Sequence, residues 1–279
     1  MFTLNCKGKL IEFEKPVIMG ILNMTDDSFY LGDLKSKIPS TLKKVENMIA
    51  DGADIIDIGG QSTRPGSLRI SVEDELNRIL PIIKLINQKF PSQILSVDTY
   101  QSEVVKVSSE EGVSIVNDIS GGTMDDKMIE TVADLKMPYV CMHTKGTPET
   151  MQTLCNYNDV TAEVLKDLSI KTDQCIKAGI KDVIIDPGFG FAKNIEQNFK
   201  MLSQLNVFKM LGKPLLVGLS RKSTIYKTLK ITANESLNGT TCLNTIALLN
   251  GADILRVHDV KEASETIKLI GELKKAANN

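Results

Sequence analysis

The sequence predicts a single TIM (β/α)8 barrel over residues 1–279, and two observations favour this fold class. Short apolar runs rich in Val and Ile recur eight times, and they are too continuously hydrophobic for strands with one solvent-exposed face. Segments with the apolar spacing of amphipathic helices separate these runs. Eight strand and helix units at intervals of about 35 residues match the usual size of this barrel. No linker rich in Pro, Gly or Ser divides the chain.

The candidate strands follow one another in a regular order. They cover residues 16–24, 53–60, 94–99, 114–120, 138–144, 182–188, 214–220 and 253–259. Because strands that are buried on both faces occur in parallel sheets covered by helices, we expect them to pair in parallel. An open, doubly wound sheet is the alternative. It would leave two edges unprotected and would usually carry a glycine-rich phosphate loop after its first strand.

The intervening segments carry both helical periodicity and helix stop signals. Apolar residues at helical spacing are Leu42, Val45 and Ile49, then Leu76, Ile79, Leu80 and Ile83, and near the C-terminus Ile267, Ile270 and Leu273. A glycine stands just before four of the candidate strands, at Gly52, Gly112, Gly179 and Gly251. A left-handed residue after a helix is least costly for glycine, so these positions predict repeated helix ends.

Composition and charge exclude several classes of function. Lys and Arg number 33 against 35 Asp and Glu, so the net charge of -2 offers no overall positive field for nucleic acid or an anionic membrane. No apolar run approaches the length of a membrane span, and charges interrupt residues 1–16 where a signal peptide needs an apolar core. We therefore expect a cytoplasmic protein. Five cysteines without a C-x-x-C pair indicate reduced thiols, and two histidines are too few for a His-rich zinc site.

Residues 188–193 imitate a dinucleotide-binding fingerprint. Gly188 and Gly190 occupy the first two glycine positions, but Lys193 stands where a third glycine would allow close helix packing. We therefore discount nucleotide binding at this segment.

Polar residues interrupt the apolar runs near their C-terminal ends, where barrel enzymes place their chemistry. They are Asn23, Asp57, Asp98, Asn117, His143, Asp186, Ser220, Arg221, Lys222, Arg256 and His258. Each alone could cap a helix or form a structural pair, but so many together favour a site. Burying an ionised carboxylate is costly unless it is paired, so Asp98 and Asp186 require donors inside the barrel mouth. We interpret Asp57 and Asp118 as structural, with hydrogen-bond donors from the backbone or from Arg.

Cationic residues follow the second, seventh and eighth candidate strands, at Arg64, Arg221, Lys222, Arg256 and His258. Because such barrels often bind phosphate after strands seven and eight, this pattern predicts a small phosphorylated substrate. Arg256 and His258 are two residues apart and would face the same side of a strand. A structural pair of Arg256 with Asp253 or Asp259 is the alternative.

Three further residues extend this prediction beyond the phosphate. Ser223 opens the helix after the seventh strand, where it either binds a second anion or acts as a plain N-cap. Asn23 offers an oxygen ligand of the kind that Mg²⁺ prefers. Phe29 stands in a polar loop and, with Pro65 in the next one, either packs onto the barrel or closes over a flat apolar ligand.

These residues lie in motifs that resemble the dihydropteroate synthase family of the folate pathway. The motifs are GILNMTDDSF (20–29), GADIIDIGGQSTRPG (52–66), SVDT (96–99), NDISGG (117–122), MHTKGTPETMQ (142–152), DPGFGFAKNIEQN (186–198), GLSRKS (218–223) and RVHD (256–259). They run through almost the whole chain, and STRPG, SRKS and RVHD in that order are very specific. The sequence departs from the usual family motifs at Asp26, Gln61, Thr144, Lys145 and Ala192.

The resemblance implies a transferase that joins 6-hydroxymethyl-7,8-dihydropterin diphosphate to p-aminobenzoate and releases diphosphate and 7,8-dihydropteroate. By matching motif positions it implies that the pterin is held by Asp98, Asn117, Asp186 and Lys222, of which Asp98, Asp186 and Lys222 are the expected catalytic residues. It places the diphosphate at Thr63, Arg64, Arg256 and His258, and the p-aminobenzoate at Phe29, Pro65, Phe191 and Ser223. It also implies Mg²⁺ at Asn23, a homodimer and a sulfonamide target.

We expect diphosphate to leave first, giving a pterin-methyl cation that Asp98 and Asp186 stabilise. Direct displacement by the amine is the alternative mechanism. A pterin-dependent methyltransferase and a non-catalytic pterin-binding paralogue are the alternative functions. The methyltransferase would not require STRPG or SRKS, and pterin binding without diphosphate release would favour the paralogue.

Overall fold

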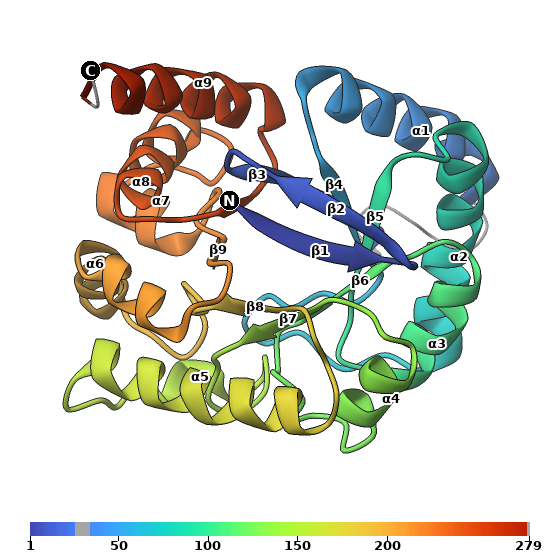
Figure 1. Cartoon of the computed structure of the whole chain (residues 1–279), viewed down its shortest axis with the longest axis horizontal. Coiled ribbons are helices and arrows are strands. Elements are labelled where there is room, and N and C mark those ends of the chain that lie inside the picture. The colour runs from blue at the N-terminus through green and yellow to red at the C-terminus, as the bar shows by residue number, and fades with distance from the viewer. Residues whose placement is uncertain (26–33, 278–279) are drawn as a thin grey trace.

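Eight parallel strands form a ring at the centre of the part of the chain that the computed structural model describes, residues 1–25 and 34–277 (Figure 1). The strands are β3 (Val17–Asn23), β4 (Ile55–Gly59), β5 (Ile94–Asp98), β6 (Ile115–Asp118), β7 (Tyr139–Met142), β8 (Val183–Asp186), β9 (Leu216–Val217) and β10 (Ile254–Val257). Their order in the sheet is β8-β7-β6-β5-β4-β3-β10-β9. A further parallel bridge joins Ile185 of β8 to Leu215, directly before β9, and closes the sheet on itself. The predicted barrel is confirmed, and the alternative of an open sheet is wrong.

The described helices surround this ring in chain order (Figure 1). They are α1 (Leu34–Asp51), α2 (Val72–Lys89), α3 (Ser102–Glu110), α4 (Met128–Asp134), α5 (Val160–Lys177), α6 (Ile195–Ser203), α7 (Ser223–Leu229), α8 (Leu237–Leu249) and α9 (Val260–Ala277), with short 3-10 turns η1 (Met151–Thr153) and η2 (Leu205–Leu211). The predicted helix stops are confirmed, because φ is +106° at Gly52, +115° at Gly112, +104° at Gly179 and +95° at Gly251. Within the described ranges, no helix combines the length and hydrophobicity needed to cross a membrane.

The inner wall of the barrel changes from apolar to polar along the strands. Its N-terminal layer is a hydrophobic cluster that includes Val17, Ile55, Ile115, Val140, Ile184, Leu216 and Ile254. Side chains alternate between the two faces of a strand, so the residues two further on also face inward. These include Asp57 after Ile55, Asn117 after Ile115, Asp186 after Ile184 and Arg256 after Ile254. The barrel therefore has an apolar floor and a polar mouth at the C-terminal ends of its strands.

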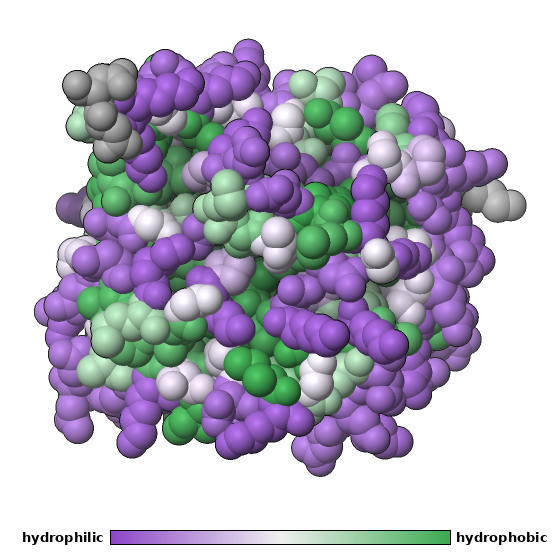
Figure 2. Space-filling view, in the orientation of Figure 1, coloured by the Kyte–Doolittle hydropathy of each residue, from purple (hydrophilic) through white to green (hydrophobic). Residues whose placement is uncertain are grey.

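A β-hairpin at the start of the chain covers the N-terminal end of the barrel. It consists of β1 (Phe2–Cys6) and β2 (Lys9–Phe13), which pair antiparallel and lie across the front of the ring in Figure 1. Lys7 and Gly8 both have positive φ, +55° and +79°, as a two-residue hairpin turn requires. The buried side chain of Leu4 joins the apolar floor. Figure 2 shows this face, where hydrophobic side chains appear between the hairpin and a hydrophilic outer rim. The eight apolar runs of the sequence do not include this hairpin.

Candidate active site

Arg256 lies at the centre of the barrel mouth between two carboxylates. Its Nε donates to Asp57 Oδ2 over 2.6 Å, and its Nη2 donates to Asp98 Oδ2 over 2.5 Å. Asn117 Nδ2 also donates to Asp57 Oδ2, over 2.9 Å. The two aspartates and Asn117 are buried, whereas the Arg256 side chain is 18% exposed. Four strands, β4, β5, β6 and β10, thus meet at one polar cluster.

The alternative pairing of Arg256 with Asp253 or Asp259 is wrong. Asp253 instead accepts from Lys209 Nζ over 2.7 Å, and Asp259 forms a two-point pair with Arg221, over 2.7 and 2.9 Å. Arg256 faces inward with Ile254, so it cannot reach a side chain on the outside of the barrel. Arg221, which sequence analysis grouped with the phosphate-binding cations, links the loops after β9 and β10.

One guanidinium shared by two buried carboxylates leaves negative charge in the mouth. Burial raises the pKa of Asp98 to about 7, although the positive charge of Arg256 opposes this shift. Burial disfavours the charge on Arg256 too, but Asp57 and Asp98 hold its pKa above the usual value. Among the described residues, Asp57 Oδ1 and Asp98 Oδ1 are buried without a hydrogen-bond partner. A buried carboxylate oxygen without a hydrogen bond costs free energy, so these two oxygens favour a ligand that supplies N–H donors.

Asp186 and Lys222 form the opposite side of the mouth. Asp186 ends β8 and its Oδ1 accepts from the amide of Gly188 over 2.7 Å. Burial raises the pKa of Asp186, and the charge of Lys222 opposes the shift. Lys222 stands directly before α7, where burial lowers its pKa to about 8 against the opposing effect of Asp186. Its ammonium donates to the carbonyl of Phe189 and interacts electrostatically with Asp98. The structure therefore gathers all four residues predicted to hold the pterin.

The residues predicted for the diphosphate lie at the same end of the barrel. His258 follows β10, and its Nδ1 lies 3.0 Å from Ser220 Oγ. Burial and the nearby charge of Arg256 lower the pKa of His258 to about 4, so its ring is neutral at pH 7 and can donate a hydrogen bond without carrying a charge. Thr63 is half-buried and Arg64 is exposed, both on the loop after β4.

The residues predicted for p-aminobenzoate are only partly described. The half-buried Phe191 packs against Tyr100 and Met142, and its ring centroid lies 4.7 Å from Lys222 Nζ. Pro65 is exposed on the loop after β4. Ser223 is the first residue of α7 and the N-cap is Lys222, so the interpretation of Ser223 as a plain N-cap is wrong. Phe29 and Asp26 lie outside the described residues.

The comparisons with known proteins agree on one family. Residues 19–258 match the sequence profile described as pterin binding enzyme. The dihydropteroate synthase of Escherichia coli strain K12 is 40% identical over 275 residues, which cover 98% of this chain and 97% of the relative. The chain belongs to the dihydropteroate synthase family. The resemblance stated from the motifs is confirmed.

Two solved dihydropteroate synthase structures share the fold over nearly the whole chain. The Yersinia pestis enzyme in a sulfonamide drug complex has a TM-score of 0.92 and 34% identity, covering 98% of this chain and 100% of that one. The Xanthomonas albilineans enzyme with 4-aminobenzoic acid has a TM-score of 0.90 and 34% identity, and covers 98% of each chain.

The departures from the family's usual motifs that the structure describes, at Gln61, Thr144, Lys145 and Ala192, lie outside the polar cluster of Asp57, Asp98, Asn117 and Arg256. Gln61 Nε2 donates to the carbonyls of Ser62 and Leu68, over 2.7 and 2.9 Å, and its Oε1 accepts from the Ile70 amide over 2.8 Å. The amide thus holds the loop after β4 by both donating and accepting. Lys145 lies 3.5 Å from the centroid of the Tyr157 ring, on the loop after β7.

The structural role predicted for Asp57 agrees with its contacts, because its Oδ2 accepts from Arg256 and from Asn117 within the mouth. Asp57 stands two residues after Ile55, so both side chains face the inside of the barrel. His143 and Lys193 are also buried and contact each other, although they lie 50 residues apart. No local sequence signal predicts that contact.

Proposed function

We propose that the chain catalyses the dihydropteroate synthase reaction, in which the pterin-methyl group of 6-hydroxymethyl-7,8-dihydropterin diphosphate is transferred to p-aminobenzoate. The observation that carries this proposal is the buried acidic pair of strand ends, Asp98 and Asp186, facing the partly desolvated Lys222. A neutral heterocycle with N–H donors and a carbonyl acceptor complements this arrangement better than an anion does. Membership of the family supports the same substrate.

The pterin ring offers hydrogen-bond donors and acceptors that complement the side chains of the mouth. Its ring N–H and amino groups donate to Asp98 and Asp186, while its acceptors face Lys222 and Asn117. The unpartnered Oδ1 of Asp98 supports this placement. Because each partner is already fixed at the end of a strand, little reorganisation is required when the ring binds.

Arg256, His258, Thr63 and Arg64 form the proposed diphosphate site. Arg256 is fully charged and half-buried, so it can neutralise the leaving group at short range. His258 contributes a hydrogen bond from a neutral ring.

A magnesium ion at this site would be held mainly by the diphosphate of the substrate, with few ligands from the protein. Among the described residues, no group of three or more His, Cys, Asp or Glu side chains could hold a metal. Asn23 places one exposed amide oxygen at the end of β3, and Mg²⁺ usually takes one or two protein oxygens together with phosphates and water. When bound, Mg²⁺ would supply charge stabilisation to the departing diphosphate. We therefore propose Asn23 as its protein ligand.

The reaction begins with cleavage of the C–O bond between the pterin methylene and the diphosphate, and the electron pair leaves with the diphosphate. Asp98 and Asp186 stabilise the positive charge that spreads into the ring. The amine of p-aminobenzoate then forms the C–N bond and loses a proton to solvent. An aromatic amine is neutral at pH 7, so no side chain needs to activate it. Positional isotope exchange within the diphosphate when p-aminobenzoate is absent would support this order over direct displacement.

Phe191, Pro65 and Ser223 form the described part of the proposed p-aminobenzoate site. The ring of Phe191 beside Lys222 offers an apolar wall, and Ser223 offers a hydroxyl for the carboxylate. The 4-aminobenzoic acid in the Xanthomonas albilineans relative supports this substrate class. The sulfonamide complex of the Yersinia pestis relative supports inhibition of this chain by competition at the same site.

A homodimer is proposed from the outer surface of the last two helices. Ile246 and Leu249 of α8 and Leu269 and Leu273 of α9 are large apolar side chains that remain exposed. The two helices pack against each other, so these side chains lie on adjoining elements. Light scattering that gave the mass of one chain would contradict the dimer.

The decisive assay measures diphosphate and 7,8-dihydropteroate released from the pterin substrate with Mg²⁺, with and without p-aminobenzoate. We expect equal amounts of both products only when p-aminobenzoate is present. Pterin binding without diphosphate release would favour the non-catalytic paralogue. Methyl transfer without diphosphate release would favour the methyltransferase.

A further inference from the structure

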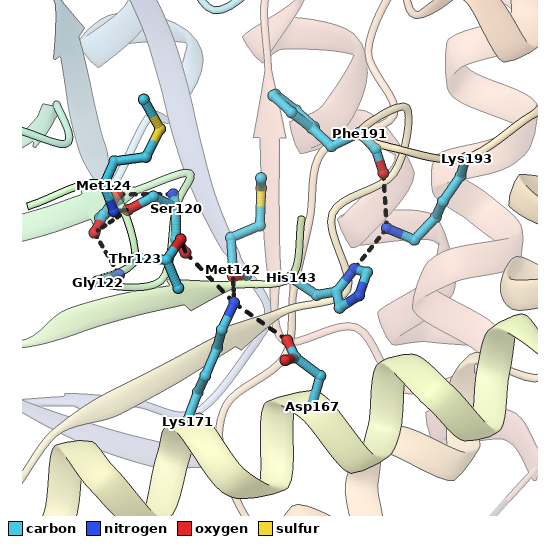
Figure 3. A network of polar contacts seen from close by, with 11 residues as sticks. Ser120, Gly122, Thr123, Met124, Met142, His143, Asp167, Lys171, Phe191 and Lys193 are labelled. Atoms are coloured by element: carbon cyan, nitrogen blue, oxygen red, sulfur yellow. Dashed lines mark hydrogen bonds and ion pairs between the residues drawn. The ribbon is translucent and has the colours of Figure 1, made fainter. Parts of the chain in front are cut away.

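Lys193 is a buried lysine that touches none of the residues proposed to contact the pterin. Its side chain is almost completely enclosed, with 3% of the residue exposed. Its Nζ donates to the carbonyls of Gly188 and Phe191, both over 2.9 Å, and lies 3.0 Å from His143 Nδ1. Figure 3 shows the contacts with Phe191 and His143. Burial lowers the pKa of Lys193 to about 7, against the opposing charge of Asp186, and the three acceptors match the three protons of its ammonium form.

His143 is an acceptor in this contact. It follows β7, and burial together with the charge of Lys193 lowers the pKa of its imidazole to about 2. The ring is therefore neutral, and its Nδ1 has a lone pair for Lys193. The amide of His143 also donates to the carbonyl of Asp186 over 3.0 Å. His143 thus joins the end of β7 both to β8 and, through Lys193, to the segment that follows β8.

The segment from Gly188 to Lys193 has a shape that the chain would not adopt unaided. Alternate residues are left-handed, with φ of +71° at Gly188, +82° at Gly190 and +48° at Ala192. The left-handed conformation is strained for a residue with a Cβ such as Ala192. Lys193 binds one carbonyl near the beginning of the segment and one near its end. This double contact fixes the curvature between them.

The same segment sets the positions of two residues of the proposed site. The carbonyl of Phe189 accepts from Lys222 Nζ, and the ring of Phe191 lies 4.7 Å from that nitrogen. A displacement of the segment would therefore move the Phe191 ring and release Lys222. Asp186 would be less affected, because it belongs to β8 and lies before the segment.

We infer that Lys193 is a positioning residue for the p-aminobenzoate subsite, acting through the carbonyls of Gly188 and Phe191 with His143 as its third partner. This inference rests on the proposed function. Lys193 acts on Phe191 and Lys222 through the backbone and contacts no substrate.

The test compares Lys193→Met with Lys171→Met. Lys171 of α5 is a similarly buried lysine, which donates to the carbonyls of Ser120 and Met142 over 3.4 Å and pairs with Asp167 over 3.1 Å (Figure 3). Both variants remove a buried ammonium, but only Lys193→Met releases the segment after β8. The control therefore shows what loss of stability alone does to the kinetics.

We expect Lys193→Met to lower kcat/KM for p-aminobenzoate about 10- to 100-fold, as displacement of a reactant by about 1 Å can do. The dissociation constant of the pterin diphosphate, measured by calorimetry without p-aminobenzoate, should rise by a smaller factor than kcat/KM falls, because Lys222 loses the Phe189 carbonyl but keeps its electrostatic interactions with Asp186 and Asp98. Lys171→Met should change neither value by more than about threefold. Equal kcat/KM for p-aminobenzoate in Lys193→Met and the unmodified chain would overturn the inference.

A second readout is independent of turnover. The amides of Gly188, Gly190 and Phe191 donate to Asp186 Oδ1, Asn198 Oδ1 and the Gly188 carbonyl, so their hydrogen exchange should be slow. In Lys193→Met we expect exchange of residues 187–194 to accelerate about tenfold or more, and in Lys171→Met we expect no such change. An unmodified chain without activity would contradict the proposed function, whereas unchanged exchange in Lys193→Met would overturn the role of Lys193.

A pair of His143 variants covers the case in which Lys193→Met does not fold. The Oδ1 of Asn can take the place of Nδ1, so His143→Asn should retain nearly normal kinetics with p-aminobenzoate. His143→Val removes the acceptor and should raise the KM for p-aminobenzoate about threefold to tenfold. Identical KM values in the two variants would also overturn the inference.

Discussion

Substitution of Asp98 by Asn should separate the stability of the chain from its activity. Burial raises the pKa of Asp98 from 3.8 to about 7, with Arg256 opposing the shift. A carboxyl whose pKa is raised by folding binds its proton more tightly in the folded than in the unfolded chain. The unmodified chain therefore loses stability as the pH rises from 3.8 through 7. Asn resembles the protonated carboxyl at every pH, so Asp98→Asn does not undergo this loss.

The size of the effect follows from the two pKa values. A difference of about three units at about 1.4 kcal/mol per unit gives about 4 kcal/mol over the whole titration. Between about pH 5.5 and about pH 8.5 the expected part is about 2 kcal/mol. We therefore expect the free energy of unfolding of Asp98→Asn, relative to the unmodified chain, to rise by about 2 kcal/mol across this range.

Urea unfolding of both chains at several pH values measures this difference. Asp134→Asn changes an exposed carboxylate at the end of α4 and is the matched control, for which the difference should stay nearly constant. At the same time Asp98→Asn should lower kcat/KM for the pterin substrate about 100-fold, because a charge that stabilises the cation is lost. A relative stability that is independent of pH, or that falls as the pH rises, would refute the reasoning.

Three further predictions concern the cationic side of the mouth. Lys222→Ala should raise the activation free energy derived from kcat/KM by about 2 to 5 kcal/mol, because Asp186 loses its charge partner. Lys145→Ala, on the loop after β7, should leave kcat/KM nearly unchanged. Steady-state kinetics that found equal losses for the two variants would contradict the assignment. His258 has its pKa lowered to about 4, so the profile of kcat/KM between pH 6 and pH 8 should keep its shape in His258→Gln while its level falls. An inflection near pH 6.5 in the profile of the unmodified chain that disappears in His258→Gln would contradict the lowered pKa of His258. Removal of Mg²⁺ with a chelator should abolish diphosphate release. The dissociation constant of 6-hydroxymethyl-7,8-dihydropterin, which lacks the diphosphate, should change by less than about threefold in calorimetry. Loss of that binding would contradict a metal held through the diphosphate.

The sequence was sufficient to predict the barrel because its signals are local and repeated. Each buried strand forms a continuous apolar run, and Gly52 and Gly251 mark helix ends that any other residue would make more costly. The hairpin was not predicted because both strands are short and mixed in polarity: β1 contains Thr3 and Asn5, and β2 contains Lys9 and Glu12. Its apolar side chains, such as Leu4, are buried only by contact with the barrel floor.

The sequence predicts which residues form the site, but not which of them contact each other. Asp98 and Asp186 were identified because a charge inside an apolar strand requires an explanation. The partner of Arg256 was not predictable, because Asp57 lies 199 residues away and register alone brings the two together. The contact of Lys193 with His143 likewise depends on the path of the chain after β8.

A crystal structure with 6-hydroxymethyl-7,8-dihydropterin diphosphate bound tests the central claim most directly. We predict that the pterin ring lies in the mouth of the barrel within hydrogen-bond distance of Asp98, Asn117 and Asp186, with its diphosphate toward Arg256 and His258. A ring bound outside the mouth, with Asp98 still paired only to Arg256, would contradict the account.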